Sequence, residues 1–189
     1  MKKIFYIILL VLSFVSCETK KEHPLSPEFE DVRILMQTEP EAALLKLQNL
    51  KNSESQKLNN SESQKLSNSA TQDLFNLEYT ILLAEALYKN YLPQSNFDDV
   101  KAIVDYIEKE KSTPNSTLLI PDYLCAKAHY YHAVGLSERE NIASTCEHYL
   151  KALEILSEIK NPDQEQTRFI FLTYTRLGEL FLYEEILSC

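Results

Sequence analysis

The sequence predicts an all-α fold in which about seven helices form antiparallel hairpins, stacked side by side as a short solenoid. Only two glycines occur in 189 residues, whereas a sheet-rich chain of this length would need more of them in its turns. Leu, Ala, Glu and Lys, which favour helices, are abundant. Apolar side chains also recur at the short intervals that line one face of a helix.

The first hairpin follows two helix-start signals. Ser26, Pro27 and Glu28 offer an N-cap, a proline at the first helical position and an acid in the first turn, so a helix is expected over residues 27–37. Thr38 and Glu41 have the spacing of a capping box. A second helix is therefore expected to begin beside Pro40.

Residues 52–75 form a tandem octad, in which NSESQKLN is followed by NSESQKLS and by the diverged NSATQDLF. Eight residues advance a helix by about 80° beyond two full turns, so the leucines of successive copies do not share a face. We interpret residues 52–70 as a polar, low-complexity loop, with helix resuming near Thr71. A continuous helix through the octads is the alternative.

The later helices are marked by apolar stripes and by further start signals. Ser137 and Glu140 are spaced as a capping box, and Asn161-Pro162-Asp163 is a second restart. The expected helices lie at residues 73–90, around the stripe 100–107, at 121–136, around 149–156, and from 163 nearly to Cys189.

The first sixteen residues have the pattern of an export signal. Lys2 and Lys3 precede an apolar run at residues 4–15, and twelve helical residues reach only about 18 Å, too short to span a bilayer core of about 30 Å.

Ser16-Cys17 resembles the lipobox of bacterial lipoproteins, although Phe14 replaces the usual Leu. The resemblance implies a lipidated Cys17 and a tether at residues 17–26. Because Glu18 is not the Asp of inner-membrane lipoproteins, the outer membrane is expected. An ordinary secretory signal is the alternative.

The formal net charge of −9 restricts the partners. An acidic surface repels phosphate backbones and anionic lipid, so neither nucleic acid nor a bare membrane surface is expected to bind. Membrane contact is expected through the N-terminal lipid only. A basic or neutral polypeptide fits this charge.

Residues 121–187 resemble tetratricopeptide repeats. Ala133 takes the small position of a first helix, and Tyr149 and Ala152 follow at the family spacing on the second. Tyr174-x-x-Leu177-Gly178-x-x-Phe181 restarts the motif, and Leu83-Ala84-x-x-Leu87 is a weaker earlier copy. The resemblance implies that residues 27–189 form a right-handed solenoid, irregular because its equivalent positions are spaced more widely than in the family.

The same segments are similar to the exported N-terminal repeat region of tetratricopeptide-repeat sensor regulators. The segments concerned are residues 82–91, the helix with Tyr130-Tyr131, and residues 149–153. We therefore expect a non-enzymatic scaffold of the cell envelope that mediates protein–protein interaction. The alternative is an exported sensory module of a truncated or split signalling regulator. Helical support in an outer-membrane glycan-uptake complex ranks last.

A partner-binding groove is predicted along the first helix of each repeat, because these helices line the concave face of such solenoids. The predicted groove residues are Glu78, Ile81, Glu85, Tyr88, Lys89, Lys127, Tyr130, Val134, Thr175 and Glu179. Family members that bind chaperone tails hold the terminal carboxylate with a clamp of Lys and Asn. Ile81 and Tyr130 stand at the corresponding positions, so a chaperone-adaptor role is not expected.

No cofactor, metal or catalytic residue is predicted. Histidines are common metal ligands, but we interpret His129, His132 and His148 as packing residues between helices. Cys125 and Cys146 are expected to be about 12 Å apart along their hairpin, so we predict two unpaired, buried thiols.

Overall fold

The computed structural model describes residues 25–60, 69–113 and 120–187, and within these ranges every regular element is helical. The all-α prediction is confirmed. A short 3-10 helix, η1 (Pro27–Phe29), leads into seven α-helices in the described part of the chain. These are α2 (Glu30–Thr38), α3 (Pro40–Asn60), α4 (Ser69–Lys89), α5 (Phe97–Ser112), α6 (Asp122–Ser137), α7 (Ile142–Glu158) and α8 (Gln164–Leu187). Among them, none is both long and apolar enough to cross a bilayer. The signal peptide, Cys17 and most of the tether lie outside the described residues.

Two of the predicted start signals can be compared with hydrogen bonds. Asp163 and Gln166 form a reciprocal cap at α8, because each side chain accepts a backbone N–H of the other, at 2.8 and 3.0 Å. The predicted box at Ser137 and Glu140 is wrong. Ser137 is still the last residue of α6, and α7 instead starts after Asn141, whose side chain caps Ser144.

The octad prediction also needs correction. α3 runs to Asn60, so the first octad copy is helical and not the expected loop. Its Glu, Gln, Lys and Leu residues are good helix formers, and no Gly or Pro interrupts them, so the helix begun at Pro40 propagates into the repeat. Most of the second copy lies outside the described residues, and α4 begins at Ser69, close to the expected Thr71.

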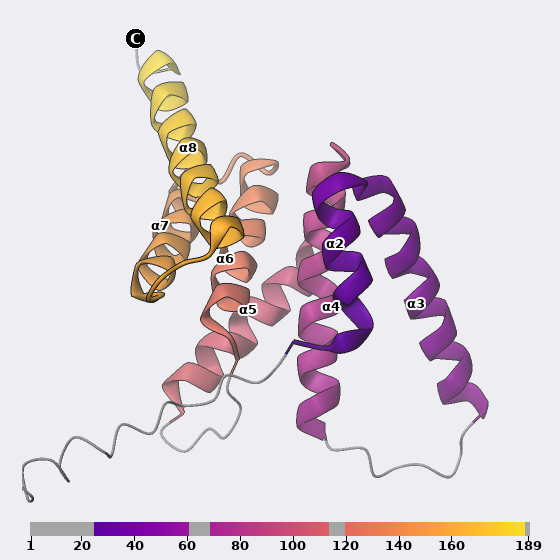
Figure 1. Cartoon of the computed structure of the whole chain (residues 1–189). Helices are drawn as coiled ribbons and strands as arrows, with labels where there is room; N and C mark the ends of the chain where they lie inside the picture. The colour runs from indigo at the N-terminus through magenta and orange to yellow at the C-terminus, as the bar shows by residue number, and fades with distance from the viewer. Residues whose placement is uncertain (1–24, 61–68, 114–119, 188–189) are drawn as a thin grey trace, which may run out of the picture.

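Two apolar cores lie on different faces of α4. The smaller core joins η1, α2 and α3 to one face of α4, and it is built on Phe29, Val32, Met36, Ala43, Leu47, Leu82 and Ala86. The larger core takes Leu77, Ile81 and Ala84 from α4 and joins them to α5, α6, α7 and α8. Figure 1 shows α4 between the α2–α3 hairpin and the later helices.

α6 is the central helix of the larger core. All of its residues from Leu124 to Leu136 are buried, and α7 is its most extensive neighbour. A helix buried all round must pair its polar side chains inside the protein. Lys127, His129 and His132 are therefore the residues of α6 whose partners matter most.

A side chain at Gly135 of α6 would not fit beside α5. The ring of Phe97, the first residue of α5, lies so close that a methyl group at Gly135 would overlap it. The guanidinium carbon of Arg139 lies 3.8 Å from the centroid of the same ring. A glycine here lets α5 approach α6 closely.

Candidate protein-binding surface

The predicted groove is largely filled by protein. Six of its ten residues are buried, namely Glu78, Ile81, Glu85, Lys127, Tyr130 and Val134. Tyr88 and Lys89 are half-buried, and Thr175 and Glu179 are exposed. The prediction of an open groove along α4 and α6 is therefore wrong. For Glu85, Lys127 and Tyr130 the reason is that side chains of α4, α6 and α8 contact one another at these positions.

An ion network accounts for three of the groove residues. Its members are Glu85, Lys89, Tyr123, Lys127 and Glu165, of which Glu85 and Lys127 are buried and Glu165 is exposed. The ammonium of Lys127 on α6 lies 2.8 Å from the Glu85 carboxylate on α4 and 3.1 Å from the Glu165 carboxylate on α8. Lys89 completes the contacts of Glu85 at 3.1 Å, and the Tyr123 hydroxyl donates to Glu165 at 2.9 Å. One cation thus connects three helices.

The charges in this network are mutually stabilised. Burial by itself would raise the pKa of Glu85, but the nearby Lys127 and Lys89 outweigh it and hold that pKa below its usual value. Burial would likewise lower the pKa of Lys127, yet the carboxylate of Glu85 keeps it above its usual value. Both groups are therefore charged at neutral pH, and Lys127 is no candidate for a neutral amine nucleophile.

Tyr88 and Tyr130 belong to a second contact between the same helices. The hydroxyl of Tyr88 accepts hydrogen bonds from Nε of Arg176 on α8 at 2.8 Å and from the Tyr130 hydroxyl at 3.2 Å. The rings of Tyr88 and Tyr130 meet edge to face with centroids 6.0 Å apart. These tyrosines hold α4, α6 and α8 together.

Glu78 is buried for a different reason. Its carboxylate accepts the backbone N–H of Ser26 at 2.8 Å and also pairs with Arg33. It therefore fixes the segment that leads into η1. Ile81 and Val134 simply lie in the larger core.

The histidines and cysteines can be compared with their predicted roles. His129 and His132 are buried and His148 is half-buried between α6 and α7, as expected for packing residues. In the described ranges, no group of three or more His, Cys, Asp and Glu side chains could hold a metal ion. Cys125 and Cys146 are both free, as predicted. Cys125 is buried, which raises its pKa to about 11, whereas Cys146 is only half-buried.

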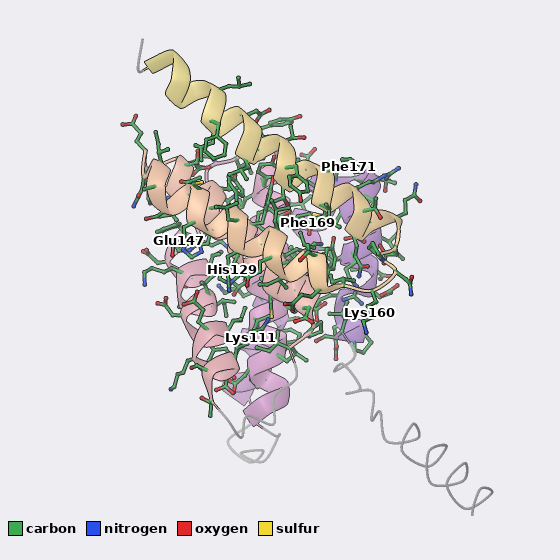
Figure 2. The ribbon with its side chains drawn as sticks, turned by 90° about the vertical axis from the view of Figure 1, so that its left-hand side faces the viewer. Lys111, His129, Glu147, Lys160, Phe169 and Phe171 are labelled. Atoms are coloured by element: carbon green, nitrogen blue, oxygen red, sulfur yellow. The ribbon has the colours of Figure 1, made fainter. Side chains whose placement is uncertain are left out.

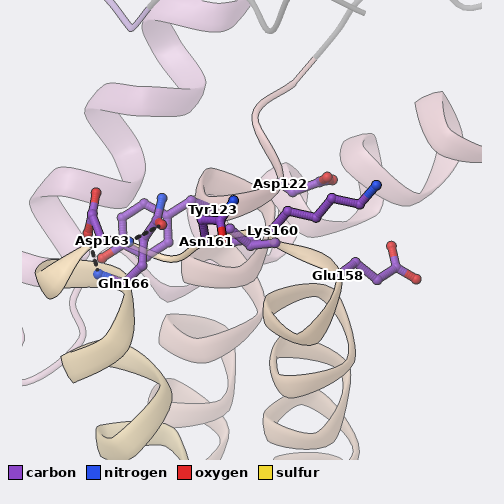
Figure 3. Close-up of a pocket in the computed structure, with 8 residues that line it drawn as sticks. Asp122, Tyr123, Glu158, Lys160, Asn161, Asp163 and Gln166 are labelled. Atoms are coloured by element: carbon purple, nitrogen blue, oxygen red, sulfur yellow. Dashed lines mark hydrogen bonds between the residues drawn. The ribbon is translucent and has the colours of Figure 1, made fainter. Parts of the chain in front are cut away.

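A shallow polar pocket of about 420 Å³ lies at the turn between α7 and α8 (Figure 3). Its lining residues are Asp122, Tyr123, Glu158, Ile159, Lys160, Asn161, Asp163 and Gln166. Several of these groups already have partners inside the protein. Asp163 and Gln166 cap α8, and Asp122 pairs with Lys111 at 3.2 Å. The pocket is a consequence of the turn and brings no reactive pair together.

An exposed apolar stripe runs along α8. We call Phe171, Tyr174, Gly178, Phe181 and Leu182 the α8 stripe. At 100° per residue they fall within about 100° of arc, on a different side of the helix from the buried Phe169, Thr173 and Leu177. Its four large side chains are 56–68% exposed. Figure 2 labels Phe169 and Phe171 on this helix.

Gly178 lies in the middle of this stripe and leaves open space. Within the described chain, nothing outside the helix itself lies within 4 Å of a Cβ placed on Gly178. Another helix could approach the α8 backbone closely at this point. Thr175 and Glu179, the two exposed members of the predicted groove, flank the stripe on one side.

Sequence reasoning missed the α8 stripe because α8 carries two apolar faces. Phe181, which the repeat motif includes, is 56% exposed. The available signal was the spacing of positions 171, 174, 178, 181 and 182, which forms a second helical stripe beside the buried one.

Comparison with known proteins leaves the chain unassigned, because no family model, no curated protein and no solved structure matches it.

Proposed function

We propose that this protein is a non-enzymatic scaffold, tethered to the bacterial cell envelope through a lipidated Cys17, that binds the amphipathic helix of a partner protein along the α8 stripe. The observation that carries the proposal is the stripe itself. Four large apolar side chains share one exposed face, with an unobstructed glycine between them. A contiguous exposed apolar face of this kind favours an interaction site.

The chain itself offers a precedent for the docking mode. The repeat resemblance makes Gly178 of α8 equivalent to Ala133 of α6. Ala133 is fully buried, and α7 packs along its helix. A partner helix on α8 would take the place that α7 takes on α6.

The charge of the chain favours a foreign partner over a second copy. The formal net charge is −9, so two copies repel each other, whereas a helix with basic residues beside its apolar stripe is attracted. The proposed occupant is therefore an amphipathic helix with basic flanks.

Site-specific photo-crosslinking tests this surface. A photoreactive phenylalanine analogue at position 174 of the full-length protein in intact envelopes is expected to give one discrete adduct. Mass spectrometry should map the adduct to an amphipathic, basic-flanked helix. The matched control is the analogue at Ile34 on α2, because Ile34 and Tyr174 are both 59% exposed.

Removing two of the other large side chains of the stripe is expected to weaken that adduct strongly. With the analogue at position 174, the pair Phe171→Ser and Phe181→Ser should lower its yield at least about tenfold, which corresponds to losing about 1.4 kcal/mol of binding. Ile34→Ser should leave the yield unchanged. The same adduct from position 34, or an adduct with a second copy of this chain, would show that the proposed occupant is wrong.

Lipidation has its own test. Cells given an alkyne-tagged fatty acid are expected to label the wild-type protein, and Cys17→Ser should remove the label and release the protein from the membrane fraction. Cys125→Ser is the control, because that thiol is buried in the fold. Labelling that survives Cys17→Ser would refute anchoring at this residue.

The exported sensory module remains the alternative function. The all-helical fold is compatible with both functions. The exposed α8 stripe is the observation that favours the scaffold. A mapped adduct with a membrane-spanning or DNA-binding regulator would favour the sensory role.

A further inference from the structure

Three histidines from two helices meet between α6 and α7. His129 and His132 lie one turn apart on α6, and His148 lies on α7. Nδ1 of His129 is 3.1 Å from Nδ1 of His148, and the rings of His132 and His148 meet edge to face with centroids 4.3 Å apart. We call these residues the histidine cluster. Figure 2 labels His129 within it.

The geometry of the histidine cluster suits neutral rings. The contact between Nδ1 of His129 and Nδ1 of His148 requires one donor and one acceptor, so two protonated rings would direct two hydrogens at each other. Both ring nitrogens of His132 are buried and have no hydrogen-bond partner in the described structure, and its ring stacks on Phe97 at 5.1 Å. An added proton would therefore place a poorly compensated charge inside the protein.

The surrounding charges compensate such a proton poorly. The charged groups that act on the cluster are Lys101, Asp105, Glu108 and Lys111 from α5, Arg139 from the turn after α6, and Glu147, Lys151 and Glu154 from α7. Four of these groups are basic and four are acidic, so together they supply no net negative charge to a protonated ring. Burial, followed by the influence of His148, lowers the pKa of His129 and His132 to about 4, and burial also lowers the pKa of His148.

We propose that the histidine cluster is an acid-sensitive contact that holds α7 on α6 at neutral pH and releases it in mildly acidic solution. The contact is separate from the α8 stripe and does not depend on what binds there. Its effect would be to loosen α7, and with it α8, from the rest of the fold.

The direction of the effect follows from proton binding. A separated or unfolded histidine takes up its proton near pH 6.5, whereas His129 and His132 in the packed state do so only near pH 4. Between these values the separated state binds more protons. The packed state is therefore fully favoured above about pH 6.5 and loses stability as the pH falls towards 4.

Hydrogen exchange of the full-length protein in detergent, with EDTA present, locates the effect. From pH 7 to pH 5, after correction for intrinsic rates, the amides of α7 are expected to exchange at least about tenfold faster. The amides of α2 and the start of α3 should change little. Unchanged protection of α7, or an equal loss of protection in α2 and α3, would overturn the proposal.

The matched control is the double variant His132→Phe with His148→Phe, which keeps aromatic rings at both positions but removes two titrating groups. Its Tm is expected to decrease less between pH 7 and pH 5 than the Tm of the wild type. An equal loss in both proteins would contradict the proposal. If the variant does not fold, an NMR titration of the wild-type imidazoles decides, because titration of His129 and His132 near pH 6.5 would also overturn it.

Discussion

Replacing Lys127 by methionine is expected to lower the free energy of unfolding by about 3 kcal/mol, the largest effect of any single substitution that we predict. Methionine keeps the length of the side chain but removes the cation that joins α4, α6 and α8. Glu85, only 3% exposed, would then keep a single ionic partner, Lys89. A buried carboxylate with less compensation accounts for the loss. Urea denaturation would measure it, with an unchanged m-value showing that unfolding remains two-state.

Two further variants separate burial from charge. Lys151→Met removes an exposed ion pair, in which Nζ of Lys151 lies 2.7 Å from the Glu154 carboxylate, and should cost much less than Lys127→Met because solvent screens the pair. The double variant Lys127→Met with Glu85→Met should recover most of the loss, because no charge is left buried. The explanation would be wrong if Lys127→Met cost no more than Lys151→Met.

The pH dependence provides a separate check on the same substitution. The lowered pKa of Glu85 means that its ion pairs stabilise the fold above the usual carboxyl value of 4.5, and that this contribution is lost as the pH falls through the lower folded value. In Lys127→Met the pKa of Glu85 should rise, so that acid neutralises it. The stability difference between the two proteins should therefore be largest at neutral pH and shrink as the pH falls towards 4.

Replacing each of the two glycines by alanine should change the free energy of unfolding in opposite directions. Gly135→Ala is expected to lower the free energy of unfolding by about 1–3 kcal/mol, because the new methyl group would overlap the ring of Phe97 and force α5 away from α6. Gly178→Ala should instead raise it by up to about 1 kcal/mol, since alanine is the better helix former and the site is open. The measurement is urea denaturation of both variants beside the wild type.

A second substitution tests the cause of the Gly135 effect. Combining Gly135→Ala with Phe97→Ala removes the obstructing ring, so the two losses should be less than additive. Fully additive losses, or a stabilising Gly135→Ala, would show that the Phe97 contact is not the reason. For Gly178→Ala, a more stable chain that also gives a weaker crosslink at position 174 would agree with a helix packed against that glycine.

The local signals in the sequence were sufficient to predict where most of the helices begin and end. Pro27, Pro40 and Asp163 each mark a start because a ring or a capping side chain suits the first turn whatever the rest of the fold does. The unpaired Cys125 and Cys146 also followed from helix geometry alone. The first octad was misjudged, because a polar repeat without an apolar face can still extend a helix that begins before it.

The sequence by itself determined the helical class, the order of the hairpins and most of their limits, since periodicity and capping act within a few residues. Only the tertiary structure decided which faces are open. Glu85 and Lys127 are separated by 42 residues, and their burial became visible only when α4, α6 and α8 were in contact. The same holds for the α8 stripe, because a helix with two apolar faces does not reveal which of them its neighbours cover.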